Sequence, residues 1–145
     1  MMRASLLLSV LFFVGCAANP VVEYDLYKAY SDLSALVASD SIVKEKNNYF
    51  TSSYLNEVND EDEKSLFLLK IPKHIKHVDS HYQKINGEIG CLTINGFESN
   101  SDPVSIYIEY KYDSGQWRVN YMYVNFLENR DGFVKSPICP DELEE

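Results

Sequence analysis

Three histidines and one aspartate lie close together in the middle of the chain, as His74, His77, Asp79 and His81. Imidazole and carboxylate groups are common zinc ligands, so this cluster raises the question of a metal site. On a β-strand, at roughly 3.3 Å per residue, His77 and His81 stand about 13 Å apart, too far to share one ion held at about 2.1 Å. A helix would bring them together, but it would have to begin directly after Pro72. We therefore expect a solvated polar strand face, with no metal and no cofactor.

Nucleophilic and phosphate chemistry find little support in the sequence. It contains no G-x-S-x-G elbow, no P-loop and no G-x-G-x-x-G phosphate cradle. Cys91 and Cys139 are nucleophiles only as free thiols, which an oxidising compartment disfavours. The sequence leaves open whether the chain is an enzyme, and it favours a non-catalytic protein.

The eleven tyrosines are the most unusual feature of the composition. Tyr24, Tyr27 and Tyr30 fall on one side of the first expected helix, and several others fall in the last two expected strands. Tyrosines that line a concave sheet could stack on a sugar, a peptide or an aromatic ligand. Tyrosine also suits strands that are half buried and half hydrated, and we favour this structural interpretation.

The N-terminus has the form of a secretory signal. One positive charge, Arg3, precedes the apolar stretch Ala4–Val14. As a helix, these residues would cover about 16 Å at roughly 1.5 Å per residue, about half of a bilayer core. The stretch is therefore expected to be a cleaved h-region rather than a membrane-spanning helix.

The end of this segment, Phe13-Val14-Gly15-Cys16, resembles the lipobox of bacterial lipoproteins. The resemblance implies that Cys16 receives a diacylglyceryl group, that a peptidase cuts before it, and that the new N-terminus is acylated. Phe13 departs from the pattern, because leucine is usual there. The alternative is an ordinary secretory peptide cut after Ala18, with residues 16–18 as an imperfect A-x-A site.

The lipobox resemblance also implies an address in the bacterial envelope. Ala17 after the cysteine resembles the class sorted to the outer membrane, with the domain facing the periplasm. The membrane would then be a partner through the lipid. We expect a signal peptide at 1–15, a lipidated tether at 16–21, one domain at 22–139 and an acidic tail at 140–145.

Length and charge narrow the functional classes. The 145 residues include 13 basic and 22 acidic ones, which gives a net charge of −9. Such a surface repels nucleic acid, so we expect no DNA or RNA partner. The part after the signal has the size of one domain.

Two helical segments begin the expected domain. One face of an amphipathic helix is indicated by the spacing of four residues, Leu26, Tyr30, Leu33 and Val37, and the helix should end near residues 39–41. A second helix is expected over roughly 42–58. Residues 59–63 lack the glycine and alternation of a calcium loop. Instead, Asp60 with Glu63 resembles the cap of a short helix that Pro72 would stop.

After Pro72 the apolar period changes to two, and Asn86-Gly87 and Ser114-Gly115 mark two hairpins. In the second hairpin, we expect Tyr110 to lie opposite Val119. The same register, continued, pairs Ile108 with Tyr121 and Ile106 with Tyr123. The apolar pattern of the first hairpin does not stay on one face, which predicts a bulge.

Helices followed by an antiparallel meander predict an α+β domain in which N-terminal helices pack on a curved sheet of about four strands. Over residues 22–127 this order resembles the nuclear-transport-factor-like cone shared with ketosteroid isomerases, and it would also suit a cystatin-like domain. The isomerase resemblance implies a pocket with a carboxylate base and a hydroxyl donor, roles that Asp79 and one of several tyrosines could fill. The favoured function is a membrane-anchored envelope lipoprotein with a non-catalytic interaction or small-ligand-binding domain. The alternative is a pocketed isomerase-like or other small cone-fold enzyme.

If Cys16 carries lipid, two cysteines remain in a compartment that oxidises thiols. We therefore expect a disulfide between Cys91 in a strand and Cys139 in the C-terminal segment. The alternative is two unpaired cysteines, with Cys91 a small core residue.

Overall fold

The structure is a computed structural model and describes residues 24–143. The expectations for the signal peptide at 1–15, for Cys16 and for the tether lie outside the described residues, as do the last two residues of the expected acidic tail. Between Tyr24 and Leu143, no helix is both long and apolar enough to cross a membrane.

The first helix, α1 (Leu26–Ala38), is the one that the apolar spacing predicts. It begins at Asp25, whose side chain accepts a hydrogen bond from the Lys28 backbone N–H. This satisfies one of the backbone donors that a helix leaves free in its first turn. The four residues of the expected face are all buried against the sheet.

The expectation of one helix over 42–58 is wrong. Two helices form instead, α2 (Ile42–Tyr49) and α3 (Ser52–Leu55), and Phe50 between them has extended backbone angles. Phe50 makes a parallel bridge to Val119 in the sheet, and the Thr51 N–H donates to the Val119 carbonyl. The break in the helix lets the Phe50 side chain enter the core, where it is 1% exposed. Burial of this ring outweighs the helical hydrogen bonds that the break removes.

The next helical segment begins two residues later than expected. The N-cap of α4 (Glu63–Leu66) is Asp62, which accepts hydrogen bonds from two backbone N–H groups, whereas Asp60 pairs with Lys46. The chain continues directly as the 3₁₀ helix η1 (Phe67–His74), which contains Pro72 rather than stopping before it.

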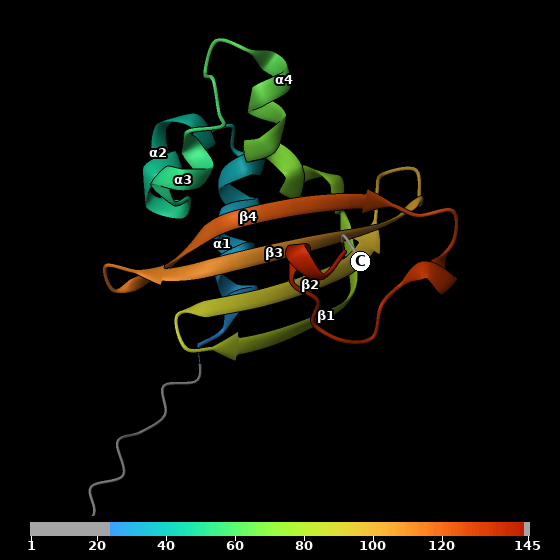
Figure 1. Cartoon of the computed structure of the whole chain (residues 1–145). Helices are drawn as coiled ribbons and strands as arrows, with labels where there is room; N and C mark the ends of the chain where they lie inside the picture. The colour runs from blue at the N-terminus through green and yellow to red at the C-terminus, as the bar shows by residue number, and fades with distance from the viewer. Residues whose placement is uncertain (1–23, 144–145) are drawn as a thin grey trace, which may run out of the picture.

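Four antiparallel strands form one open sheet in the order β1-β2-β3-β4 (Figure 1). Their bounds are β1 (His77–Asn86), β2 (Ile89–Phe97), β3 (Pro103–Asp113) and β4 (Gln116–Phe126). Both expected hairpins are present, and Gly87 and Gly115 adopt positive φ angles in their turns. The α+β class, with helices preceding and packing on a four-stranded antiparallel sheet, is confirmed.

The expected register of the second hairpin holds only from the turn to Val119. Asn120 is then an extra residue in β4, and every later pair shifts by one position. Ile108 therefore lies opposite Met122 rather than Tyr121, and Ile106 opposite Val124 rather than Tyr123. This bulge turns Met122 and Val124 toward the helices and leaves Tyr121 and Tyr123 on the other face.

The bulge expected in the first hairpin is also present. Val78 pairs with Gly96 and Ser80 with Asn95, so Asp79 is the extra residue. Because of this extra residue, β1 can pair on both sides of Asp79 with β2, whose Leu92 and Ile94 both belong to the core.

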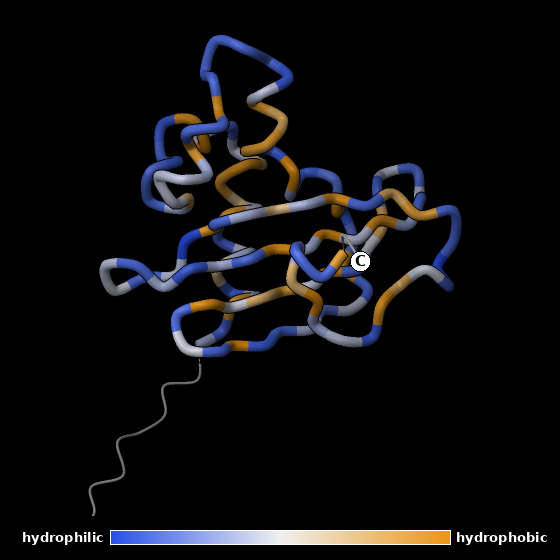
Figure 2. The backbone as a smooth tube through the Cα atoms, in the orientation of Figure 1, coloured by the Kyte–Doolittle hydropathy of each residue, from blue (hydrophilic) through white to orange (hydrophobic). Residues whose placement is uncertain are grey.

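The sheet lies between two layers. The helices cover one face, and the segment after β4 returns across the other face and ends there (Figure 1). On β2, Gly90 lies against Leu26 of α1, whereas the adjacent Cys91 points to the returning segment. Apolar stretches gather where the strands meet the helices (Figure 2).

The returning segment, residues 127–143, is tied to the sheet by polar contacts. The Ile138 N–H donates to Thr93 Oγ1 at 2.9 Å, and Asn95 Nδ2 donates to the Val134 carbonyl at 2.8 Å. Residues 140–143 of the expected acidic tail form the short 3₁₀ helix η3 (Pro140–Leu143). Glu142 there bonds Lys84 at 2.7 Å, and this ammonium holds the pKa of the Glu142 carboxyl below its usual range.

Cys91 and Cys139 lie at disulfide distance, with their Cα atoms 5.1 Å apart. This separation falls within the range that the bond requires, so the geometry is consistent with the expected disulfide. Its two ends join the middle of the sheet to the end of the returning segment.

We expect no reactive thiol when the unreduced mature protein is denatured and titrated, because the expected disulfide would hold both Cys91 and Cys139. The Cys91→Ala/Cys139→Ala variant should lose about 4 kcal/mol of unfolding free energy, the chain-entropy value for a loop of this length. Urea unfolding measures the loss, and the wild-type protein unfolded in a phosphine reductant is the control. Two titratable thiols in the unreduced protein would contradict the disulfide.

Candidate functional site

The structure does not bring the three histidines together. His74 pairs through Nδ1 with Glu98 Oε1 at 2.9 Å, His77 begins β1, and the His81 ring stacks on Tyr27 with centroids 3.8 Å apart. Within residues 24–143, no three histidine, cysteine or acidic side chains form a group that could hold a metal ion. His74 and His81 each have a side-chain neighbour that accounts for their position, and His77 is exposed at the start of β1.

Asp79 and Tyr82 line the same open hollow of about 390 Å³. Asp79 occupies the β1 bulge, where it pairs with Arg130 of the returning segment. The shallow hollow around this pair is formed by the edge strand and residues 130–135. The Arg130 guanidinium occupies one Asp79 carboxylate oxygen, so this carboxylate is not free to contact a substrate there.

The tyrosines range from buried through half-buried to exposed. Tyr54 and Tyr110 belong to the core, as the structural interpretation expects, whereas Tyr121 and Tyr123 are each 45% exposed. The Tyr54 hydroxyl donates to the Leu68 carbonyl at 2.9 Å. The Tyr110 hydroxyl has no hydrogen-bond partner within the described part of the chain.

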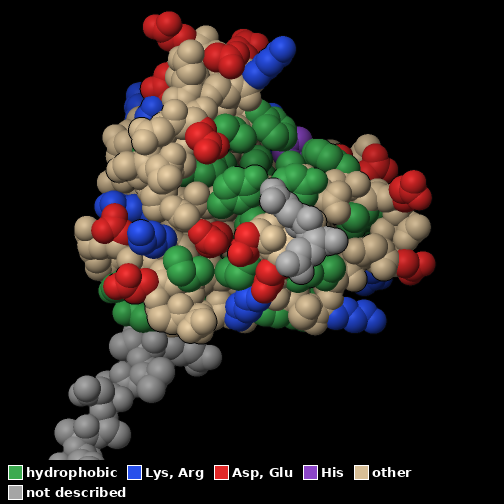
Figure 3. All heavy atoms as spheres, in the orientation of Figure 1, with side chains coloured by type: hydrophobic (Ala, Val, Ile, Leu, Met, Phe, Trp, Pro, Cys, Tyr) green, Lys and Arg blue, Asp and Glu red, His purple; other side chains and the backbone are tan. Residues whose placement is uncertain are grey.

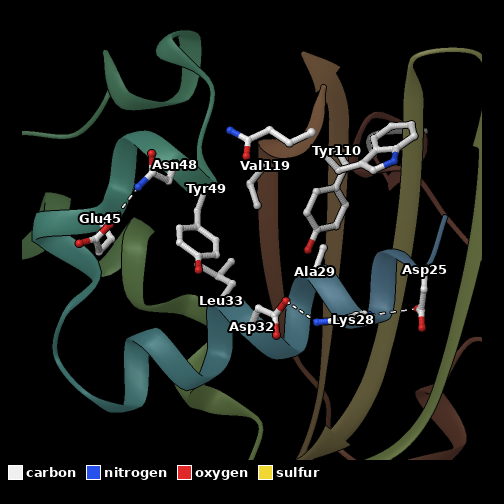
Figure 4. A pocket seen from close by; sticks show the side chains of 12 residues that line it. Asp25, Lys28, Ala29, Asp32, Leu33, Glu45, Asn48, Tyr49, Tyr110 and Val119 are labelled. Atoms are coloured by element: carbon white, nitrogen blue, oxygen red, sulfur yellow. Dashed lines mark hydrogen bonds and ion pairs between the residues drawn. The ribbon is translucent and has the colours of Figure 1, made fainter. Parts of the chain in front are cut away.

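An open cleft of about 420 Å³ lies between α1, α2 and the turn end of the β3–β4 hairpin (Figure 4). No sequence motif marks the residues around it. Its base is apolar and includes Leu33 and Val119, while its rim is polar. The lining residues are Asp25, Lys28, Ala29, Asp32, Leu33, Glu45, Asn48, Tyr49, Tyr110, Gln116, Trp117 and Val119.

Tyr110 is the most informative residue of this cleft. It reaches from β3 toward Ala29 of α1, so that its hydroxyl lies between the sheet and the helix (Figure 4). The residue is only 2% exposed, and burial raises the pKa of its hydroxyl well above the ordinary value. The group therefore stays protonated and can both donate and accept a hydrogen bond. Buried polar groups normally have a partner, so an unpartnered one calls for an explanation.

Trp117, which also lines the cleft, carries a second buried polar atom. Its indole Nε1–H also lacks a partner among the described residues. The ring is held in place by two tyrosines, because its centroid lies 5.3 Å from that of Tyr112 and 5.7 Å from that of Tyr24. Aromatic rings at such distances attract one another and fix the orientation of the indole.

Acidic groups outnumber basic ones around the cleft. Asp25, Asp32 and Glu45 face one ammonium, that of Lys28, which bonds Asp32 at 2.8 Å. Asp25 also caps α1, and Glu45 accepts a hydrogen bond from Asn48 at 2.9 Å. The rim therefore carries excess negative charge in any state in which its carboxylates are ionised.

The opposite face of the sheet carries a different surface. Hydrophobic side chains gather there beside the returning segment (Figure 3). Tyr121 and Pro140 line two neighbouring shallow hollows of about 340 and 320 Å³. Neither hollow is lined by one of the unpartnered buried polar atoms, so the α1–α2–hairpin cleft is the stronger candidate site.

No family model and no curated protein matches this chain. Among solved structures, the chain is similar to a designed protein whose title contains the name NTF2. The two chains are 14% identical, with a TM-score of 0.42, over 69% of this chain and 93% of the other. The α+β fold stated above rests on the elements of the chain itself.

Proposed function

We propose that this domain binds a small molecule in the cleft between α1, α2 and the β3–β4 hairpin, without catalysing a reaction. The observation that carries the proposal is the buried, unpartnered hydroxyl of Tyr110 on the cleft wall. A cleft of about 420 Å³ with an apolar base and a few convergent polar groups has the usual character of a small-molecule site.

The energetics of the Tyr110 hydroxyl support a ligand. A buried polar group without a partner destabilises a fold by roughly 1–3 kcal/mol. Phenylalanine would fill the same core position without this cost, since the hydroxyl makes no bond to the described chain. A bound molecule that forms a hydrogen bond with the hydroxyl would remove this destabilisation. The free energy that the hydroxyl costs the unliganded protein would then favour binding.

Binding is favoured over isomerase-like catalysis. Asp79 is paired with Arg130 and does not line the cleft. Of the cleft carboxylates, Asp32 is paired with Lys28, Asp25 serves as a helix cap, and Glu45 accepts a hydrogen bond from Asn48. A general base needs a carboxylate that is free to take a proton from the substrate.

We further propose that the mature protein is anchored by lipid on Cys16, in the outer membrane and facing the periplasm. The short apolar h-region and the Gly15-Cys16 ending support this. The two other cysteines lie at bonding distance, which suits an oxidising compartment. Positions 16 and 24 are eight residues apart, so at roughly 3.5 Å per residue the domain would stay within about 28 Å of the lipid.

Replacing Tyr110 by phenylalanine should raise the free energy of unfolding by about 1 kcal/mol, because it removes an unsatisfied buried hydroxyl. Urea unfolding of the unliganded protein measures the change. The matched control is Tyr123→Phe, which removes an exposed hydroxyl and should leave stability unchanged. A Tyr110→Phe variant less stable than the wild type would show that the hydroxyl already has a partner, and the argument for a ligand would fail.

Trp117 is the only tryptophan of the chain and lines the cleft, so its fluorescence reports directly on occupancy. In a panel of amines, alcohols, carboxylic acids and sugars, we expect at least one class to change the emission in a saturable way. Ala29→Phe, which fills the cleft from α1, should abolish the change. Ala35→Phe places the same ring on the same helix outside the cleft, and it should bind as the wild type does. Binding that survives Ala29→Phe would exclude this cleft.

Growth of expressing cells with radioactive palmitate should label the mature protein, because Cys16 is expected to carry acyl chains. The Cys16→Ala variant should take up no label and should leave the membrane fraction. An unlabelled wild-type band would end the lipoprotein proposal and favour the cut after Ala18.

A further inference from the structure

We propose that the ligand of the cleft is a small ammonium alcohol, a molecule with one positively charged nitrogen and one hydroxyl group. The inference rests on the proposed function, because it names the chemical class that the cleft between α1, α2 and the β3–β4 hairpin would take.

Charge provides the first argument. The cleft is lined by three carboxylates, those of Asp25, Asp32 and Glu45, and by one ammonium. The Lys28 ammonium is already engaged by Asp32, so it offers little to an incoming anion. Acidic ligands would meet uncompensated negative charge at the rim, in a chain whose net charge is −9. A cation would be attracted both by the cleft and by the whole protein.

Aromatic rings provide the second argument. Tyr49, Tyr110 and Trp117 line the cleft from α2, β3 and β4. The negative face of an aromatic ring attracts a cation, and sites built from several rings are the usual means by which proteins recognise quaternary ammonium groups. The apolar base around Leu33 and Val119 suits the methyl or methylene groups that surround such a nitrogen.

The unpartnered polar atoms provide the third argument, and they add the oxygen. The Trp117 indole N–H can only donate, so an acceptor atom on a ligand that reaches it would satisfy it. The Tyr110 hydroxyl can donate or accept, and it can therefore bond either the same oxygen or an ammonium N–H. A hydroxyl on the ligand supplies the acceptor without adding negative charge, which a carboxylate would add beside Asp32 and Glu45.

Choline is a suitable probe, because it has a quaternary nitrogen and one hydroxyl group. Its uncharged carbon isostere, dimethylbutanol, has nearly the same shape and keeps the hydroxyl. Tetramethylammonium keeps the charge and lacks the oxygen. Titrating the full mature protein in detergent with each compound, read by Trp117 emission and by calorimetry, separates the contribution of charge from that of the hydroxyl.

We expect choline to bind at least about tenfold more tightly than dimethylbutanol, because the attraction between a desolvated cation and aromatic ring faces increases affinity by about this factor. The affinity for tetramethylammonium should lie between the affinities for choline and dimethylbutanol. Added salt should weaken choline binding and leave dimethylbutanol binding unchanged, because only the cation interacts with the rim carboxylates.

Matched variants assign the effect to residues. Glu45→Gln should weaken choline binding about threefold, the effect of one exposed carboxylate, whereas Glu61→Gln, which removes a carboxylate outside the cleft, should have no effect. Tyr110→Phe should weaken choline binding about fivefold through the lost hydrogen bond to the choline hydroxyl, and Tyr123→Phe should leave choline binding unchanged. Both cleft variants keep their core packing, so retained folding can be verified by the unfolding transition.

Equal affinity for choline and dimethylbutanol would overturn the cation proposal. The cation proposal would also be overturned if acids or sugars bind saturably, choline does not bind, and Ala29→Phe abolishes the observed binding. In that case the cleft would still be the binding site. If no compound of the panel and none of these probes binds, both the cleft function and its cationic ligand fail together.

Discussion

Burial of β2 on both faces is the constraint on which the rest of the structure depends. From Gly90 to Gly96 every residue of this strand is buried, although the helices cover only one side of the sheet. Leu92 and Ile94 point into the helical core, and Thr93 and Asn95 point the opposite way and are equally inaccessible. The second cover must therefore come from residues 127–143, which cross that face after the last strand (Figure 1). The bond expected at Cys91 would fasten the two layers through this same strand.

The chemistry of the second face follows from what covers it. A strand buried between two apolar layers is usually a continuous apolar run. Here the covering layer is a chain without regular hydrogen bonding, so its backbone groups need partners on the sheet. Thr93 Oγ1 accepts a hydrogen bond from the Ile138 N–H, and Asn95 Nδ2 donates one to the Val134 carbonyl. The Asn95 Oδ1 accepts a hydrogen bond from the Ser105 hydroxyl at 2.8 Å. Apolar side chains at these positions would leave the returning backbone unsatisfied, which explains three polar residues in the middle of a sheet.

Much of the fold could be predicted from local patterns, because the four buried residues of α1 and the two glycine turns are short-range signals. The break of the second helix at Phe50 could not, since the ring gains its burial from Val119, far away in sequence. The shift at Asn120 was hidden because both possible registers of β4 present apolar or aromatic residues to the helices. The cleft was missed for a related reason. Its rim residues look like ordinary solvated helix faces, and only packing shows that they surround two unpartnered donors.

The broken helix and the cleft have one origin. Phe50 turns the chain toward the sheet, so α2 ends at Tyr49 on one side of the cleft instead of continuing along α1. The space beside Ala29 and Leu33 therefore stays open, and the turn end of the hairpin brings Tyr110 and Trp117 to its other wall. Filling this space or replacing the Tyr110 hydroxyl would each make the free energy of folding more favourable, so stability alone does not explain why both features are present. The same core contact that stabilises the fold through Phe50 thus keeps open a cleft lined by Tyr110, whose buried hydroxyl has no partner among the described residues.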